Sequence, residues 1–215
     1  FLHLIKMIIQ FSISLVLILF NFLFPETLKS ENLSQKCNDV KNIQKLKLTT
    51  IPDSMGEIFK NIFAKQVDVF GLKIYATEGI SDSDTLHAAY VQAEYLDNDE
   101  DGLVDDPLLV EKLLEKKAHI VIFKTEAHAN RKIDKLDDLS EELNFNITEL
   151  YGNETFPKGS SKRGFDSSLE EILHSITHYG YSEVYPEALA INQDSILTNA
   201  MDIARGGRFK NVPRR

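Results

Sequence analysis

Two stretches of the chain have the composition of strands. Residues 67–77, VDVFGLKIYAT, and residues 118–125, AHIVIFKT, are rich in β-branched and aromatic side chains and contain few charges. Such stretches are typical of segments that contribute to a buried sheet. The pattern predicts one strand in each of them.

Four other stretches have the pattern of helices, at residues 81–96, 106–117, 167–179 and 194–205. Ser81 or Asp82 can cap the first, Pro107 suits the first turn of the second, and Gly206-Gly207 stops the last. Residues 131–163 are polar and predict loop around one weak helix. These elements together indicate the α+β class, with a small sheet packed with several helices.

The N-terminal region differs from the rest of the chain. Residues 7–24 contain no charged side chain, and Pro25 and the polar residues after it end the apolar run. This pattern predicts a signal peptide within residues 1–30 and a secreted, extracellular protein. Because 18 residues are close to the shortest length that spans a bilayer, a signal anchor in a membrane of the secretory pathway is the alternative. Residues 31–215 are expected to form a single α+β domain.

Three Asn-x-Ser/Thr sequons, at Asn32, Asn146 and Asn153, fit passage through the secretory pathway, where they can be glycosylated. Cys37 is the only cysteine in the sequence, which excludes an internal disulfide and a cysteine-ligated zinc site. Unpaired cysteines are unusual in secreted proteins. We therefore expect a domain that is C-terminally incomplete at residue 215 and a partner for Cys37 in its continuation.

The charge balance limits the partners. The sequence has 33 Asp and Glu against 24 Lys and Arg, a net charge of −9. Such a surface repels nucleic acid and anionic lipid and attracts cations. We expect no nucleic-acid partner, and contact with a membrane only if the N-terminal segment is not cleaved.

The most specific motif is DNDEDGLVDD, residues 97–106. Asp97, Asp99 and Asp101 stand at alternate positions, Gly102 permits a sharp turn, and Asp105 stands where a ninth-position ligand belongs. The motif resembles the D-x-D-x-D-G calcium loops of EF-hand, dockerin and thrombospondin-repeat proteins. That resemblance implies Ca²⁺ held by the four aspartates between two helices.

The calcium-loop pattern is incomplete at its end. Counting from Asp97, the twelfth residue is Leu108, where EF-hands place a bidentate glutamate, and the nearest later acid is Glu111. The competing interpretation is an acidic, solvated turn. Five aspartates within ten residues repel one another unless a cation is present, which favours calcium.

The helix predicted at residues 167–179 gathers ionisable side chains on one side. At about 100° per residue, Glu170, Glu171, His174 and His178 share one arc. The apolar residues occupy the opposite side: Leu169, Ile172, Leu173 and Ile176. An ordinary amphipathic helix explains this pattern without any function. However, residues 164–204 contain no lysine or arginine and seven acids, which favours a bound cation.

This helix resembles the H-E-x-x-H active-site helix of zincin metallopeptidases, if Glu170 replaces the first histidine. The resemblance implies a zincin-like arrangement with Zn²⁺ held by Glu170, His174 and His178, and Glu171 as general base. Alternatively, Glu171 is the third ligand and Glu170 a spectator. Four further residues could complete the ligand set: His87, His128, Glu183 and Glu187. Tyr179, Tyr181 and Tyr185 could polarise an oxyanion or could simply pack.

Two functions follow from these motifs. The first is a secreted, zincin-like zinc hydrolase acting on a peptide or protein, with a structural calcium loop. The second is a secreted calcium-binding or matrix-interaction protein without catalysis. A serine or cysteine hydrolase is unsupported, because no nucleophile-elbow motif occurs and Cys37 lies near the processed N-terminus.

Overall fold

The computed structural model describes residues 46–159, 164–191 and 194–205, which belong to one compact unit. The predictions for the signal segment, for Asn32, for Cys37 and for the helix stop at Gly206-Gly207 fall outside these residues. Within the described ranges, the helices are too short or too polar to cross a bilayer.

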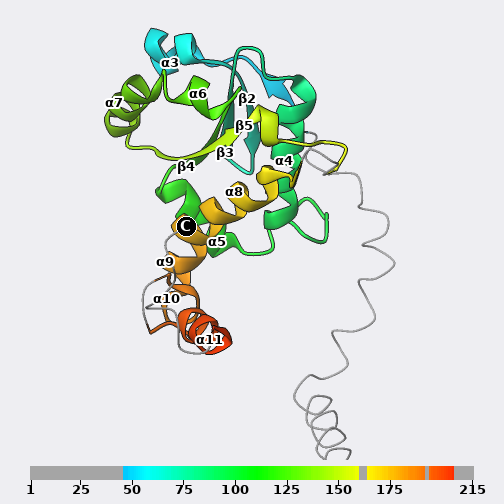
Figure 1. Cartoon of the computed structure of the whole chain (residues 1–215), viewed down its shortest axis with the longest axis vertical. Helices are drawn as coiled ribbons and strands as arrows, with labels where there is room; N and C mark the ends of the chain where they lie inside the picture. Colours follow the sequence, from blue (N-terminus) through cyan, green and yellow to red (C-terminus); the bar gives the residue numbers. More distant parts are fainter. Residues whose placement is uncertain (1–45, 160–163, 192–193, 206–215) are drawn as a thin grey trace, which may run out of the picture. The chain divides into compact units, whose positions relative to one another are not determined.

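Strands and helices are interspersed between Leu48 and Tyr151, and the elements described after Tyr151 are all helical (Figure 1). In chain order, the elements are β1 (Leu48–Thr49), η2 (Asp53–Met55), α3 (Gly56–Ile62), β2 (Phe63–Val69), β3 (Leu72–Thr77), α4 (Asp82–Leu96), α5 (Pro107–Glu115), β4 (Ala118–Phe123), α6 (Glu126–Ala129), α7 (Ile133–Leu143), β5 (Asn146–Tyr151), η3 (Gly152–Glu154), α8 (Ser167–Ile176), η4 (Thr177–Tyr181), α9 (Ser182–Val184), α10 (Pro186–Leu189) and α11 (Ile196–Ala204).

The five strands form one mixed sheet in the order β1-β2-β3-β4-β5. β1, β2 and β3 pair antiparallel, whereas β3, β4 and β5 run parallel, with Ile120 of β4 opposite Ile74 of β3 and Thr148 of β5. Helices α4 and α5 connect β3 to β4, and α6 and α7 connect β4 to β5. The predicted α+β class, a small sheet packed with several helices, is confirmed.

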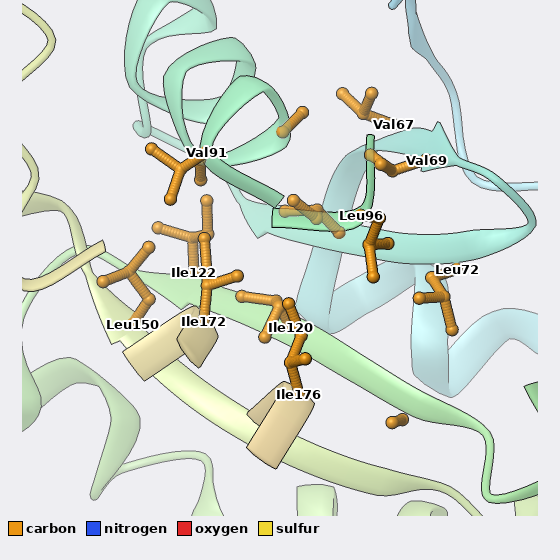
Figure 2. Packing of buried hydrophobic residues seen from close by; sticks show 14 of the residues in the cluster. Val67, Val69, Leu72, Val91, Leu96, Ile120, Ile122, Leu150, Ile172 and Ile176 are labelled. Carbon is orange, nitrogen blue, oxygen red and sulfur yellow. The ribbon is translucent and has the colours of Figure 1, made fainter. Parts of the chain in front are cut away.

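Both faces of the sheet are buried at β4. Alternate residues of this strand point to opposite faces, and each set belongs to a different apolar cluster. Ile120 and Ile122 belong to the cluster that also contains residues of α4, α5 and α8, among them Ile172 (Figure 2). Val121 and Phe123 belong to a second cluster with residues of α3, α6 and α7. Burial on both faces explains why β4 is an almost continuous apolar run.

The single strand predicted at residues 67–77 is wrong, because the stretch contains a hairpin. β2 ends at Val69, β3 begins at Leu72, and the two residues between them, Phe70 and Gly71, both have positive φ. Two successive positive φ angles are typical of a type I′ hairpin turn. The Asp68 carboxylate accepts a hydrogen bond from the Gly71 amide at 2.8 Å. The composition indicated strand on both sides, but not the reversal.

The prediction of loop around one weak helix at residues 131–163 is wrong in part. The helix is α7, which Asn144 ends with a left-handed backbone conformation. The missed element is β5, which pairs with β4 along its whole length. Its sequence, NITELY, looks polar because most of its residues are only half-buried, and the sheet ends at this strand.

His119 of β4 lies against Tyr75 and Phe145 of the second cluster, an unusual environment for a titratable side chain. Its ring lies edge-on to Phe145, with centroids 4.5 Å apart, and its Nδ1 accepts a hydrogen bond from the Lys73 amide at 3.3 Å. Burial, and then the positive charges of Lys73 and Lys117, lower the pKa of His119 to about 4. The neutral imidazole is therefore the form that fits the fold.

His119 should make the folded state sensitive to acid. The unfolded chain takes up the proton below about pH 6.5, whereas the folded chain resists it down to about pH 4. Stability should fall across this window, by up to about 3 kcal/mol from this residue. We expect His119→Gln to lose less stability than the wild type between pH 7 and 4.5 in urea titrations. His174→Gln, at an exposed position, is the control. Its free energy of unfolding should vary with pH as that of the wild type does. The same variation with pH in all three proteins would contradict this role of His119.

Candidate metal loop and the neighbouring histidine helix

The loop at residues 97–106 joins α4 to α5 and is closed by the side chain of Asp97. Asp97 is buried at the C-terminal end of α4. Its two carboxylate oxygens accept hydrogen bonds from the Asp101 amide at 3.1 Å and the Gly102 amide at 2.9 Å. Gly102 has φ 85°, a conformation that glycine adopts without strain. The predicted sharp turn at this glycine is confirmed.

Three of the four predicted calcium ligands converge. Asp97, Asp99 and Asp105 each offer an oxygen, and these atoms lie within 4.8 Å of one another. The Asp105 carboxylate also accepts a hydrogen bond from the Asn98 amide at 2.8 Å. The fourth, Asp101, lies outside this group, and its carboxylate accepts a hydrogen bond from the Leu103 amide at 2.9 Å. The three converging aspartates can hold a metal ion.

The convergence of Asp97, Asp99 and Asp105 costs electrostatic energy without a cation. Two carboxylates at such a separation repel by roughly 1 kcal/mol in bulk water and by about 3 kcal/mol near a protein surface. The backbone donors that point at Asp97 and Asp105 offset part of this repulsion. A divalent cation would remove the remainder, and an all-oxygen ligand set suits a hard cation.

The last residue of the loop, Asp106, connects it to two further elements. Its carboxylate caps α5 by accepting hydrogen bonds from the amides of Leu108 and Leu109. Its other oxygen accepts a hydrogen bond from the Tyr185 hydroxyl at 2.7 Å. This bond, together with desolvation, raises the pKa of Tyr185. Asp106 thus ties the end of the acidic loop to α5 and to the segment that follows η4.

The contact between α5 and η4 is unusually close. A Cβ atom on Gly180 would lie 2.4 Å from Cδ1 of Leu109 and 3.2 Å from Leu113. A larger residue at position 180 would therefore require the buried Leu109 side chain or the backbone of η4 to move. At the same place the helix that begins as α8 changes to π-helical hydrogen bonding over Thr177–Tyr181. The widened turn places Gly180 against α5 and changes the direction of His178 from that expected for a regular helix.

The buried face of α8 differs from the predicted apolar face. Ile172 and Ile176 are fully buried as expected, but Leu169 and Leu173 are exposed. Two small residues, Ser168 and Ser175, take their places in the interface. At about 100° per residue, the two serines lie on the same face as Ile172 and Ile176, which packs on α4 and β5, whereas Leu169 and Leu173 lie at its edge. The prediction for Leu169 and Leu173 is wrong for this reason.

The predicted zinc residues lie on the solvent side of α8 and η4. Glu170, His174 and His178 are exposed, and Glu171 is half-buried. Nδ1 of His174 lies 3.7 Å from an oxygen of Glu171. In the part of the chain that the structure describes, only the aspartate loop brings three possible ligand atoms together. The zinc assignment to these four residues stays a prediction.

Two adjoining hollows border the predicted zinc residues. One, of about 420 Å³, is lined by Leu173, His174, Thr177 and His178 together with Thr148 of β5. The other, of about 370 Å³, shares His178, Tyr179 and Ile191 with it and extends to Lys116 and Asn146. The two histidines are therefore on the wall of a groove that is partly apolar.

The reserve ligands mostly have other partners. Glu183 pairs with Lys116 at 3.0 Å, so the lysine that follows α5 neutralises one acid of residues 164–204. His87 of α4 pairs with Asp166 at 2.6 Å, and Nδ1 of His128 accepts a hydrogen bond from the Lys124 amide at 3.5 Å. Glu187 is exposed on α10. Among these four, only Glu187 has no structural contact of this kind in the described residues.

The sequence motifs did not reveal Asp166, which caps α8. Its carboxylate accepts hydrogen bonds from His87, from the Ser168 hydroxyl and amide, and from the Phe156 amide. Burial acts to raise the pKa of Asp166, but these hydrogen bonds lower it below its ordinary value. An aspartate directly before Ser167 is a recognisable N-cap signal, so the cap could have been predicted from the sequence. The hydrogen bond with His87 could not, because the two residues are 79 positions apart.

The packing at Gly180 predicts a steric effect of substitution. Gly180→Ala should force η4 away from Leu109 and Leu113 and cost about 1–3 kcal/mol, the usual cost of overpacking a core. Glu187→Ala, at an exposed position of α10, serves as the control. Urea unfolding of the three proteins measures the difference, and Leu109→Ala in the Gly180→Ala background should recover part of the loss. An unchanged midpoint for Gly180→Ala would contradict the close contact.

Comparison with known proteins identifies no relative: no family model, curated protein or solved structure matches the chain. The function must therefore be inferred from the side chains themselves. Of the predicted sites, the loop at Asp97, Asp99 and Asp105 is the one whose ligand atoms the structure brings together.

Proposed function

We propose that the protein is a secreted calcium-binding protein whose 97–106 loop holds Ca²⁺. The observation that carries this proposal is the convergence of Asp97, Asp99 and Asp105 within 4.8 Å. Carboxylate oxygens are the ligands that Ca²⁺ prefers, and Ca²⁺ accepts additional carbonyl and water oxygens in flexible geometry. Zinc is less suited to this loop, because the loop contains no imidazole or thiolate.

The position of the loop indicates a structural role for the ion. Its first ligand, Asp97, ends α4, and its last residue, Asp106, caps α5. An ion bound there would fix the connection between these two helices, both of which cover the same face of the sheet. Calcium would thereby stabilise the folded state in proportion to its occupancy.

Calcium should raise the melting temperature of the wild-type protein. Asp99 is exposed and belongs to the converging group, so Asp99→Asn should remove a ligand without disturbing the core. We expect this variant to lose most of the calcium-induced shift measured by circular dichroism in chelator and in millimolar CaCl₂. Asp138→Asn, at an exposed position of α7, should retain the full shift. An equal shift in both variants would place the calcium effect elsewhere, and a larger shift with MgCl₂ would argue for a smaller cation.

A zinc-dependent hydrolase is the second candidate function, and the groove beside His174 and His178 favours it. Imidazole and carboxylate groups are suitable zinc ligands, and Glu171 lies close to His174. In this proposal Glu170, His174 and His178 would hold the zinc ion, which would supply Lewis-acid chemistry, and Glu171 would act as the general base. The partly apolar groove suits a side chain of a peptide or protein substrate.

Zinc content and turnover should respond differently to two substitutions. His174→Ala removes a ligand, so both bound zinc and peptide hydrolysis should fall. Glu171→Gln should retain zinc while turnover decreases on the order of a hundredfold or more, as expected for a lost general base. Metal analysis after dialysis against micromolar ZnCl₂, together with a peptide-library assay, measures both.

Glu141→Gln, an exposed position on α7, provides the matched control for the zinc experiment and should change neither quantity. If Glu171→Gln releases zinc and Glu170→Gln does not, Glu171 is the ligand. A wild-type protein that retains no zinc would rule out the hydrolase and leave the calcium-binding function without catalysis.

A further inference from the structure

Two adjoining hollows lie at the carboxyl ends of the parallel strands, away from both proposed metal sites in sequence. The smaller, of about 270 Å³, is lined by residues that follow β3, β4 and β5, including Ile80, Lys124 and Asn153. The larger, of about 660 Å³, lies between the first turn of α4 and residues 152–159. They share Asp84, Gly152 and Asn153 and therefore form one continuous site.

The topology explains the position of this hollow. After β3 the chain enters α4, which packs on one face of the sheet, and after β4 it enters α6, which packs on the other. Connections that leave neighbouring parallel strands toward opposite faces open a crevice between them, and ligands commonly bind in such crevices. The combined size is sufficient for a small organic ligand.

The floor and one wall of the hollow are apolar and fixed. Ile80 is buried beneath Gly152, where a Cβ atom would lie 2.8 Å from the isoleucine Cδ1. Phe156 forms part of the wall, and its amide donates a hydrogen bond to Asp166 at 3.3 Å. Its carbonyl accepts one from the Gly159 amide at 2.8 Å. These bonds hold the aromatic residue in place before any ligand arrives.

The rim of the hollow carries acidic, basic and amide side chains that can form hydrogen bonds. Asp84 and Asn153 stand on it, and their side chains have no hydrogen-bond or ion-pair partner within the described ranges. Lys124 lines the smaller hollow and Lys158 the larger one, each together with Asp84. A site with mixed charges, an amide and an aromatic wall suits a neutral ring that has many hydroxyl groups and an apolar face, which is the chemistry of a sugar.

A potential source of such a sugar is part of the chain. Asn153 begins the sequon Asn153-Glu154-Thr155, and its exposed side chain lies on the rim of both hollows. The other sequon within the described residues begins at Asn146, which is half-buried and donates a hydrogen bond from Nδ2 to the Lys116 carbonyl at 2.6 Å. Asn153 is therefore the better placed of the two to carry a glycan.

We propose that this hollow is a saccharide-binding site and that the first sugars of an N-linked glycan on Asn153 occupy it. A free saccharide of the same chemistry is the second source. The site depends on neither metal, but its glycan source rests on the secretion that is part of the proposed function. Phe156 packs on the sugar ring, and Asp84 and Lys158 bond to its hydroxyl groups.

The glycan source is tested on protein secreted from a eukaryotic host. Peptide mapping after enzymatic release of N-glycans should find Asn153 occupied, and Asn153→Gln should abolish that signal. The glycan should raise the melting temperature of the wild-type protein by a few degrees relative to the enzymatically deglycosylated form. In Phe156→Ala the same glycan should give little or no increase, because the packing surface is missing. Tyr90→Ala, an exposed aromatic residue on α4, is the matched control and should retain the increase.

The free-saccharide source is tested on unglycosylated protein from a bacterial host. Titration with N-acetylglucosamine and with its β-1,4-linked dimer should shift backbone amide resonances near Asp84 and residues 153–159 and not those of α7. If these resonances shift and Asn153 carries no glycan in the secreted protein, a free saccharide is the ligand. Two results together overturn the proposal. The first is that these amide resonances do not shift. The second is that Asn153 carries no glycan, or that its glycan raises the melting temperature equally in wild type and Phe156→Ala.

Discussion

The hydrogen bonds from the amides of Asp101 and Gly102 to the carboxylate of Asp97 determine the geometry of the acidic loop, on which the proposed calcium site depends. They close the loop after α4, bring Asp97 close to Asp99 and Asp105, and direct the chain into α5. The loop gathers negative charge that the backbone donors only partly offset. Its conformation should therefore be more stable with a divalent cation than without one.

The same loop influences the histidine helix through α5. Asp106 caps α5 and accepts a hydrogen bond from Tyr185, while Leu109 and Leu113 pack directly on Gly180 of η4. Burial, and then the negative charges of Asp106 and Asp105, raise the pKa of Tyr181. Because α5 contacts both the loop and η4, we expect a change in the loop to affect the turn that carries His178.

Local features of the fold could be predicted from the sequence because their causes are local. Ser81 caps α4, Pro107 begins α5, and the spacing of the aspartates places three of them together. Features that depend on distant partners could not be predicted. The π-helical turn depends on how Gly180 meets α5, and the hydrogen bond between Tyr185 and Asp106 joins residues 79 positions apart. β5 was missed because its half-buried residues gave no alternating apolar pattern.

Hydrogen–deuterium exchange with and without calcium tests the central claim, that the acidic loop organises α5 and η4, most directly. Calcium should slow exchange in a peptide covering residues 97–109, where the amides of Asp101 and Gly102 are hydrogen-bonded. It should also slow exchange, to a smaller extent, in a peptide covering residues 177–185. Exchange in α7 should stay the same. Calcium-dependent protection that is absent from residues 97–109, or that appears equally throughout the chain, would contradict the account.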